Sequence, residues 1–406
     1  MTVHLWANRN FRLLFSSALA TNLGDGLIAV AVPWLATLLT HDPLLIGLVA
    51  AARHAPWALF ALPAGVLTDR HDHRRLILLA DTARLGLSLA LGLVALTANP
   101  GTGPVLGLAA LAFLLGSAEV LRDNTAQTFL PDVVDKTQLE SANGALWATE
   151  RLAGQLLGPP LAGFLIGLSI ALPFGAQTLL LLAALALIAA MRLAPTAANV
   201  PHQPALAAIR EGLGWLWANP RLRRLALVSG SFNFVGYGFF AIFVLYAQNA
   251  LQLDVVGYGL FLTLIAIGGL IGSILGPWVA TRIGPTASLL LGICMFSASS
   301  AALALQAPLP VIATFMLADA FCGMLWDITV VSYRQRHIPP ALLGRVNSAY
   351  RFIGTGPAAL GAFAFGALVS WAATPGDPSS GLLMPYAVAS AVTALLAIYS
   401  AFRLRL

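Results

Sequence analysis

Residues Gly65 to Arg75 read GVLTDRHDHRR and decide the fold, because they place dense charge between two long apolar runs. The runs on either side, Leu44–Val66 and Leu76–Ala98, are each long enough to cross a bilayer core, which takes about 20 helical residues. Arginines collect on the cytoplasmic side of short membrane loops. We therefore predict a helical hairpin whose connection, with its three arginines, lies in the cytoplasm.

The composition of the whole chain agrees with this hairpin. Hydrophobic residues make up 59% of it and charged residues only 9%, against about 25% charged residues in soluble proteins. The mean hydropathy is +0.84, so we expect an all-α protein with many membrane spans. The net charge of +6 comes almost wholly from arginine, and Lys136 is the only lysine. Because the arginines lie in the loops of one side, we expect contact with membrane lipids and no nucleic-acid partner.

Twelve apolar spans can be read between glycines, prolines and charges. The first six are Phe11–Leu39, Leu44–Val66, Leu76–Ala98, Pro104–Phe129, Leu139–Leu168 and Leu172–Met191. The second six are Leu225–Gln248, Val255–Ala280, Ala287–Leu305, Leu309–Tyr333, Gly344–Trp371 and Leu383–Phe402. The six loops that fall on one side hold no Lys or Arg, while the other side is rich in arginine, so we predict that both termini are cytoplasmic.

The chain divides into two similar halves. Residues 1–192 form the first six-span half, 193–224 a cytoplasmic linker whose second part is an amphipathic helix, and 225–406 the second half. At an offset of 211, Asn8 recurs as Asn219 and Asn22 as Asn233; at an offset of 204, Asp123 recurs as Asp327 and Asn143 as Asn347. Such recurrence at two nearby offsets indicates a repeated fold.

The pattern G-x-L-x-D-R-x-x-x-R-R of the hairpin resembles the loop between helices two and three of the major facilitator superfamily of secondary transporters. The resemblance implies that Gly65 allows two helices to approach and that Asp69, Arg70 and Arg74 latch a cytoplasmic gate. It also implies that the substrate lies between the two halves, near the membrane midplane. The alternative is that the hairpin is only a positively charged topology anchor.

Ionisable residues inside the spans are the candidates for the chemistry, since each costs roughly 2.5 to 3.5 kcal/mol on insertion. In the superfamily, helices one, four, seven and ten line the cavity. The candidates for the cavity or for proton coupling are Asp25, Arg53, Glu119, Arg122, Glu150, Arg151 and Asp319. The further candidates for the gate, or for its support, are Asp81, Arg84, Asp123 and Asp327. For each, the alternative role is to hold helices together.

Their spacing gives four more specific expectations. Asp25 and Arg53 lie at similar depth in the first two spans, so an ion pair between them is expected. Glu119, Arg122 and Asp123 fall on one helical face. Adjacent Glu150 and Arg151 point in different directions, and we expect one of them to pair with the fourth span. Asp81 and Arg84, at the cytoplasmic start of the third span, are expected to support the Asp69 latch.

The fifth span contains GQLLGPPLAG, residues Gly154 to Gly163, which is similar to a signature of drug and proton antiporters in the superfamily. The similarity implies close helix packing through Gly158 and Gly163, with a kink at Pro159. The alternative is a general packing face of small residues. The departure is in the fourth span, where the antiporters have a lone arginine, whereas Arg122 has acidic neighbours.

Over its whole length, the chain is similar to the bacterial exporter group of the superfamily that includes macrolide and siderophore efflux proteins; NRNFRLLF, LPAGVLTDR and RQRHIPPALLGRVNSAYR carry the likeness. The resemblance implies an inner-membrane antiporter that exports small amphipathic molecules against protons and needs no cofactor. Because the sequence shows no metal-ligand spacing, nucleophile motif or phosphate loop, we expect no metal and no enzymatic activity, and we expect a monomer. Export of siderophores or lipid-like molecules is the first alternative. The second, from another class, is a membrane sensor or scaffold that transports nothing.

Overall fold

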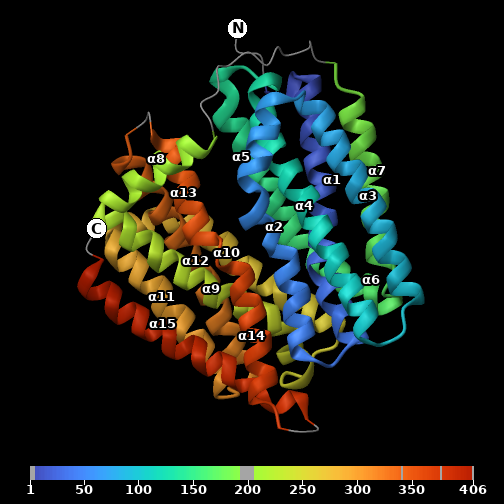
Figure 1. Cartoon of the computed structure of the whole chain (residues 1–406), viewed down its shortest axis with the longest axis vertical. Coiled ribbons are helices and arrows are strands. Elements are labelled where there is room, and N and C mark those ends of the chain that lie inside the picture. The colour runs from blue at the N-terminus through green and yellow to red at the C-terminus, as the bar shows by residue number, and fades with distance from the viewer. Residues whose placement is uncertain (1–4, 193–204, 340–341, 375–376, 405–406) are drawn as a thin grey trace. The chain divides into compact units, whose positions relative to one another are not determined.

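The computed structural model describes residues 5–192, 205–339, 342–374 and 377–404, which form helices joined by short connections (Figure 1). The chain forms two compact units. The first consists of Met1–Thr40, Ala52–Pro201 and Asp254–Thr263, and the second of His41–Ala51, His202–Leu253 and Leu264–Leu406. The predicted linker begins with residues 193–204, which lie outside the described residues, as does the side chain of Asp69.

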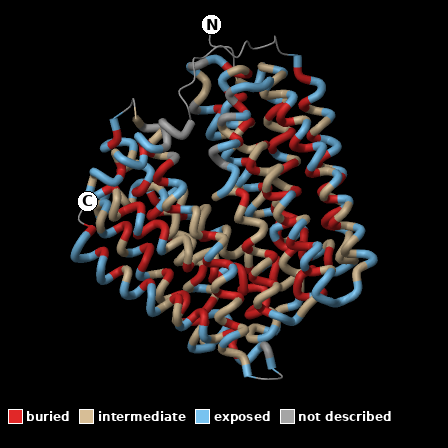
Figure 2. Tube along the Cα trace, in the orientation of Figure 1, coloured by how far each residue is buried: buried red, intermediate tan, exposed pale blue. Residues whose placement is uncertain are grey.

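The first unit is a bundle of long helices. It contains η1 (Leu5–Ala7), α1 (Arg9–Leu39), most of α2 (Pro43–Arg70), α3 (His73–Thr97), α4 (Thr102–Val133), η2 (Lys136–Gln138), α5 (Leu139–Thr149), η3 (Glu150–Leu157), α6 (Gly158–Leu168) and α7 (Leu172–Ala189). Helix α1 packs against α6 and α7, and α3 packs against α4 and α7. Figure 2 shows buried residues recurring along these helices, as expected where each helix has one packed face.

The second unit repeats the helical arrangement. It contains α8 (Ala205–Ala218), α9 (Pro220–Asn249), most of α10 (Val255–Ile283), α11 (Pro285–Ala304), α12 (Leu309–His337), α13 (Leu343–Thr355), α14 (Ala358–Ala372), η5 (Pro378–Gly381) and α15 (Leu383–Arg403). Helix α9 packs against α14, and α11 packs against α12 and α15. The predicted amphipathic helix is α8. It docks on α13, where a Cβ on Gly212 would lie 2.3 Å from the Arg345 carbonyl oxygen and Glu211 pairs with Arg345.

Eleven helices of the described chain are long and apolar enough to cross a membrane. The twelfth predicted span, Leu139–Leu168, is one continuous helical run from α5 through η3 to α6, but η3 is a π-helical turn that interrupts the regular pattern. The connection between the second and third spans is shorter than the sequence indicated. Helix α2 continues to Arg70 and α3 begins at His73, because the Asp72 side chain caps the new helix by accepting from the Arg75 amide at 2.8 Å.

Two asparagines at repeat-related positions start the first long helix of each unit. The Asn8 side chain accepts a hydrogen bond from the Phe11 amide at 3.2 Å, and the Asn219 side chain accepts one from the Leu222 amide at 3.3 Å. An asparagine in this place satisfies a backbone donor that the first turn of a helix leaves without a partner. The recurrence seen in the sequence at an offset of 211 is therefore a repeated helix cap.

Glycines allow the tightest helix crossings of both units. In the first unit, a Cβ on Gly26 of α1 would lie 2.9 Å from the Gly158 Cα at the start of α6. In the second, a Cβ on Gly361 of α14 would lie 1.9 Å from the Phe234 carbonyl oxygen of α9. No side chain fits at such a distance, so these backbones are in direct contact, as is common between membrane helices.

Candidate functional site: a buried charge network in the first unit

Asp25 lies on α1 between two glycines that bring neighbouring helices close. A Cβ on Gly26 would lie 2.2 Å from the Gly154 carbonyl oxygen, and a Cβ on Gly24 would lie 3.1 Å from the Gln177 side chain of α7. The backbone around Asp25 is thus held between η3 and α7. This packing fixes the direction in which the carboxylate leaves α1.

Arg84 of α3 is the centre of the network. Its side chain is completely buried and binds the carboxylate of Asp25, while its Nη1 lies 3.2 Å from Oδ1 of Asp81, one turn earlier on the same helix. Asp81 is also completely buried. A buried charge is costly unless it is paired, and here one guanidinium serves two carboxylates.

Arg122 of α4 extends the network. Its Nε lies 3.7 Å from Oδ1 of Asp81, and its Nη1 lies 3.5 Å from Oδ1 of Asp123. The side chain of Asp123 is 34% exposed, whereas that of Arg122 is 6% exposed. The network therefore runs from a fully buried centre on α3 to a partly exposed carboxylate on α4.

Arg53 of α2 and Glu119 of α4 form the third part. Their side chains are in direct contact, and each is less than one fifth exposed. The pair forms because α2 and α4 cross closely one turn earlier, where a Cβ on Gly116 would lie 2.6 Å from the Arg53 carbonyl oxygen. Asp25 lies within electrostatic range of both members of the pair.

The network has one more negative group than positive groups. Its carboxylates belong to Asp25, Asp81, Glu119 and Asp123, and its guanidinium groups to Arg53, Arg84 and Arg122. With every group ionised it carries one net negative charge. One proton makes it neutral, and a cation placed among the carboxylates has the same effect.

Two geometric predictions for these residues differ from the structure. The expected pair of Asp25 with Arg53 does not form: Asp25 binds Arg84, and Arg53 binds Glu119. Asp81 and Arg84 are not placed as supports at the cytoplasmic start of their helix, because both are completely buried within the network. The reason is depth, since Arg84 lies 11 residues beyond His73, about 16 Å along α3 at 1.5 Å per residue.

The gate candidates of the hairpin lie near the end of α2 and the start of α3. Arg74 donates from Nε to the Ile188 carbonyl at 3.1 Å and from Nη2 to the Ala189 carbonyl, so it satisfies acceptors at the end of α7. Arg70 is exposed at the end of α2. Within the described part of the chain, a Cβ on Gly65 would have no heavy atom within 4 Å, so the close approach implied for that glycine is not seen there.

The candidates of the second unit are separate from one another. Asp319 is half-buried on α12 and forms no ion pair or hydrogen bond with any residue that the structure describes. Asp327 lies two turns further along the same helix and is exposed, in contrast to its partly buried repeat partner Asp123. The two acids of α12 therefore have different surroundings.

The fifth span uses its motif for packing and not for charge pairing. A Cβ on Gly163 would lie 2.7 Å from the Val255 carbonyl oxygen of α10, and the Pro159 carbonyl oxygen meets Gly259 as closely. Glu150 is exposed, and Arg151 donates to the Gln155 side chain at 3.0 Å. Among the described residues neither pairs with α4, contrary to the expectation from their spacing.

Polar contacts that the sequence did not indicate surround the network. Asn22 of α1 donates to the Thr149 hydroxyl at 2.7 Å, one residue before the π-helical turn, and Ser88 of α3 donates to the Gln177 side chain of α7 at 2.7 Å. π-Helical turns are frequent at functional sites. Of these residues, only Asn22 could have been predicted to lie near the network, because it lies three residues before Asp25 on the same helix. Among the described residues, no group of three or more His, Cys, Asp and Glu side chains could hold a metal ion.

Comparison with known proteins agrees with this architecture. The family model described as Major Facilitator Superfamily matches residues 14–362. The chain belongs to the major facilitator superfamily. Members of this superfamily are transporters and not enzymes, and they need no cofactor, so the chain is a multi-pass membrane transporter.

Relatives within the superfamily are exporters. The chain is 27% identical over 371 residues to the enterobactin exporter EntS of Salmonella choleraesuis, covering 88% of this chain and 85% of the relative. It is 27% identical over 353 residues to the multidrug efflux pump Tap of Mycolicibacterium fortuitum, covering 82% and 83%. The crystal structure of the nucleoside transporter NupG matches with a TM-score of 0.76 at 14% identity, covering 98% and 100%, which shows the twelve-helix fold.

Proposed function

We propose that this major facilitator protein exports small amphipathic compounds across the bacterial inner membrane in exchange for protons, by rocking its two halves. The observation that carries the proposal is the excess of one carboxylate in the buried network. An antiporter needs a group that binds a proton when substrate is absent and releases it when substrate binds. A network that one proton or one cation neutralises meets that need.

Asp25 is the carboxylate best placed to carry the proton. When Asp25 is protonated, Arg84 keeps Asp81 as its counter-ion at 3.2 Å, so no cation is left bare. Protonation of Glu119 would instead leave Arg53 without an ion-pair partner among the described residues. The Asp25 side chain is 24% exposed, so protons can reach it, while Asp81 is closed to solvent.

The orientation follows from the arginine distribution. We propose that both termini are cytoplasmic and that the hairpin residues Gly65, Asp69, Arg70 and Arg74 act at a cytoplasmic gate. The contact of Arg74 with the end of α7 supports a latch at that end of the first unit. We further propose that the protein acts as a monomer.

Export of siderophores or lipid-like molecules is a second candidate. The support for it is that one group of relatives is named as exporters of enterobactin, while another relative is named as a multidrug pump. Guanidinium groups in the network provide donors for acidic substrates. Both candidates use the same proton carrier, so they differ in substrate and not in mechanism.

The test is transport of an amphipathic fluorescent dye into proteoliposomes under an imposed pH gradient. We expect gradient-driven accumulation by the parent, loss of that accumulation in Asp25→Asn, and retention of downhill dye exchange by the same variant. Asp377→Asn, which changes an exposed acid in the connection between α14 and α15, is the matched control. If Asp25→Asn accumulates dye as the parent does, Asp25 is not the carrier, and Glu119→Gln and Asp319→Asn become the next variants.

A further inference from the structure

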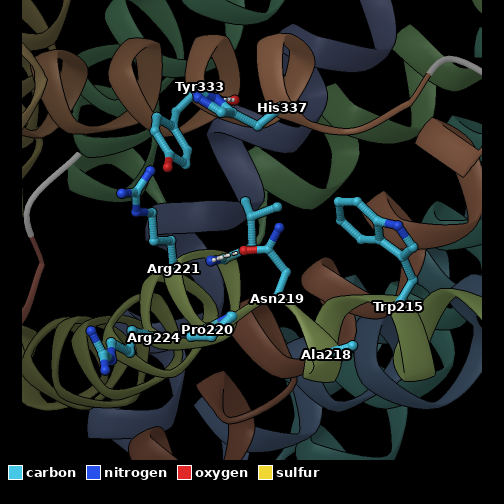
Figure 3. A pocket seen from close by; sticks show the side chains of 9 residues that line it. Trp215, Ala218, Asn219, Pro220, Arg221, Arg224, Tyr333 and His337 are labelled. Atoms are coloured by element: carbon cyan, nitrogen blue, oxygen red, sulfur yellow. Dashed lines mark hydrogen bonds between the residues drawn. The ribbon is translucent and has the colours of Figure 1, made fainter.

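A basic pocket at one end of the second unit has no role in the proposed transport cycle. It has a volume of about 560 Å³ and lies where α8, α9 and α12 meet (Figure 3). The residues that matter for its chemistry are Trp215, Asn219, Arg221, Arg224, Tyr333 and His337. None of the described residues that line it is acidic, so the pocket offers a positive field to a ligand.

Several donors in the pocket are not used within the described protein. Arg221 is exposed and has no ion-pair or hydrogen-bond partner there, and Arg224 uses one N–H, donating from Nη1 to the Arg403 carbonyl at 3.1 Å. The carbonyl oxygen of the Asn219 side chain caps α9, whereas its amide group has no acceptor among the described residues. Two guanidinium groups and an amide are thus available to an anion.

The wall formed by α12 is held rigidly. The rings of Tyr333 and His337 stack with centroids 4.0 Å apart, and Nδ1 of His337 lies 2.9 Å from the Tyr333 carbonyl oxygen. A carbonyl only accepts, so Nδ1 carries the proton. Figure 3 shows the Tyr333 ring and the Arg221 side chain extending into the same space.

The corresponding place in the first unit provides an internal comparison. There the Asn8 side chain both caps its helix and donates from its amide to the Val133 carbonyl at 2.7 Å. At the offset of 204, Phe129 stands in the place of Tyr333 and Val133 in the place of His337. Phe129 and Val133 belong to a buried apolar cluster, as Tyr333 does in the second unit, so the units differ here in the exposed His337 and in the amide of Asn219.

The arginines also belong to the second unit alone. At the offset of 211, Asn10 stands in the place of Arg221 and Leu13 in the place of Arg224. Asn10 donates to the Arg192 carbonyl at 2.9 Å and has no charge. A repeated fold does not require the basic pocket, since the first unit forms the same helix start without it.

The pocket lies at the depth of lipid headgroups. Helix α9 has 30 residues and is about 45 Å long, which exceeds the roughly 30 Å of a hydrocarbon core. The excess length must lie in the polar region of the membrane, and Arg221, Arg223 and Arg224 favour that place for the first turn. Beside it, Leu213 and Trp217 of α8 are 39% and 49% exposed, as is usual for apolar and aromatic side chains at the membrane interface.

We propose that this pocket binds the headgroup of an anionic phospholipid. Its phosphodiester oxygens would accept from Arg221, Arg224 and the Asn219 amide, which line the pocket. Charge-assisted bonds from arginine to phosphate are strong, and basic pockets between helix ends are suited to acidic headgroups. The proposal concerns binding alone and does not depend on the direction or the substrate of transport.

The test measures thermal unfolding of the full chain in a neutral detergent with three additives: short-chain phosphatidylglycerol, short-chain phosphatidylcholine and inorganic phosphate. We expect phosphatidylglycerol at saturating concentration to raise the Tm by about 3 °C, because a ligand stabilises the state that binds it. Phosphatidylcholine and phosphate should give less than half of that shift. An equal shift with phosphate would show that the pocket binds a free anion and not a lipid headgroup. An equal shift with phosphatidylcholine would show that the pocket does not select acidic headgroups.

Two variants locate the site. Asn219→Asp keeps the helix cap, since a carboxylate also accepts from the Leu222 amide, but replaces the free amide by a negative charge. Arg221→Gln combined with Arg224→Gln removes the two cations. Both should abolish the phosphatidylglycerol shift, while Arg9→Gln at the corresponding helix start of the first unit should retain it. A shift that persists in both pocket variants would overturn the proposal.

Discussion

The completely buried guanidinium of Arg84 on α3 binds the carboxylate of Asp25 on α1. The two helices are thus joined by a charge pair at the depth where an apolar contact would be expected. Asp81 shares the same guanidinium. Pairs of this kind contribute little net stability when intact, because desolvation offsets the attraction, but removal of one partner leaves a bare buried charge.

Arg84→Met should therefore destabilise the protein strongly. It leaves Asp25 and Asp81 without the cation between them, and breaking a buried pair costs about 3 to 5 kcal/mol. Thermal unfolding in detergent measures the change. Arg12→Gln, which alters an exposed arginine of α1, is the control, with an expected effect within about 0.5 kcal/mol. Equal unfolding temperatures for the two variants would show that Arg84 does not hold the network.

A double-mutant cycle should show that Arg53 and Glu119 depend on each other. Either Arg53→Gln or Glu119→Gln alone leaves one charge unpaired, whereas the double variant removes both, so the losses should not add. We expect a coupling energy of about 1 to 3 kcal/mol, in the upper part of the roughly 0.5 to 3 kcal/mol found for contacting groups in one network.

The exposed pair of Glu211 with Arg345 provides the control for that cycle. Its side chains are 47% and 32% exposed, so water screens the interaction. A surface ion pair of this kind contributes about 0 to 1 kcal/mol. Additive losses in the buried pair, or a larger coupling in the exposed pair, would contradict the predicted difference.

Gly26→Ala should lower the Tm and Gly86→Ala should not, although both place a methyl group in a spanning helix. A Cβ on Gly26 would lie 2.2 Å from the Gly154 carbonyl oxygen, while a Cβ on Gly86 would have no heavy atom within 4 Å. Alanine is favoured over glycine inside a helix by about 0.8 to 1 kcal/mol, so Gly86→Ala should raise the Tm or leave it unchanged. Gly26→Ala should lower it, because α1 must move away from η3. A Gly26→Ala variant as stable as the parent would show that the crossing is looser than described.

The twelve spans could be predicted from the sequence, but the partners of the charged side chains could not. Run length and loop arginines depend on local composition, which is why the spans could be located. Which acid meets which arginine depends on the rotation of each helix about its axis, and packing sets that rotation. The depth of Arg84 was predictable, since counting 11 residues from His73 places it about halfway through the bilayer core.

The π-helical turn is the feature that the sequence could least indicate. It begins at Glu150, immediately after Thr149, whose hydroxyl accepts from Asn22, and it places Gly154 against α1. Local propensity does not distinguish such a turn from a regular helix, because the contact with α1 is what stabilises it. The motif from Gly154 to Gly163 correctly suggested close packing but gave no sign of the altered hydrogen-bond pattern.

Asp319→Asn should weaken the binding of a cationic substrate without lowering the Tm. Asp319 forms no ion pair within the described residues, so its neutralisation leaves no guanidinium bare, and the Tm should stay the same or rise. If Asp319 faces the cavity, as its place in the tenth span suggests, the variant should bind a cationic dye about tenfold more weakly, which corresponds to about 1.4 kcal/mol. A neutral dye of similar size should bind as to the parent. Fluorescence titration of both dyes measures the difference, and unchanged affinity for the cationic dye would assign Asp319 to helix packing instead.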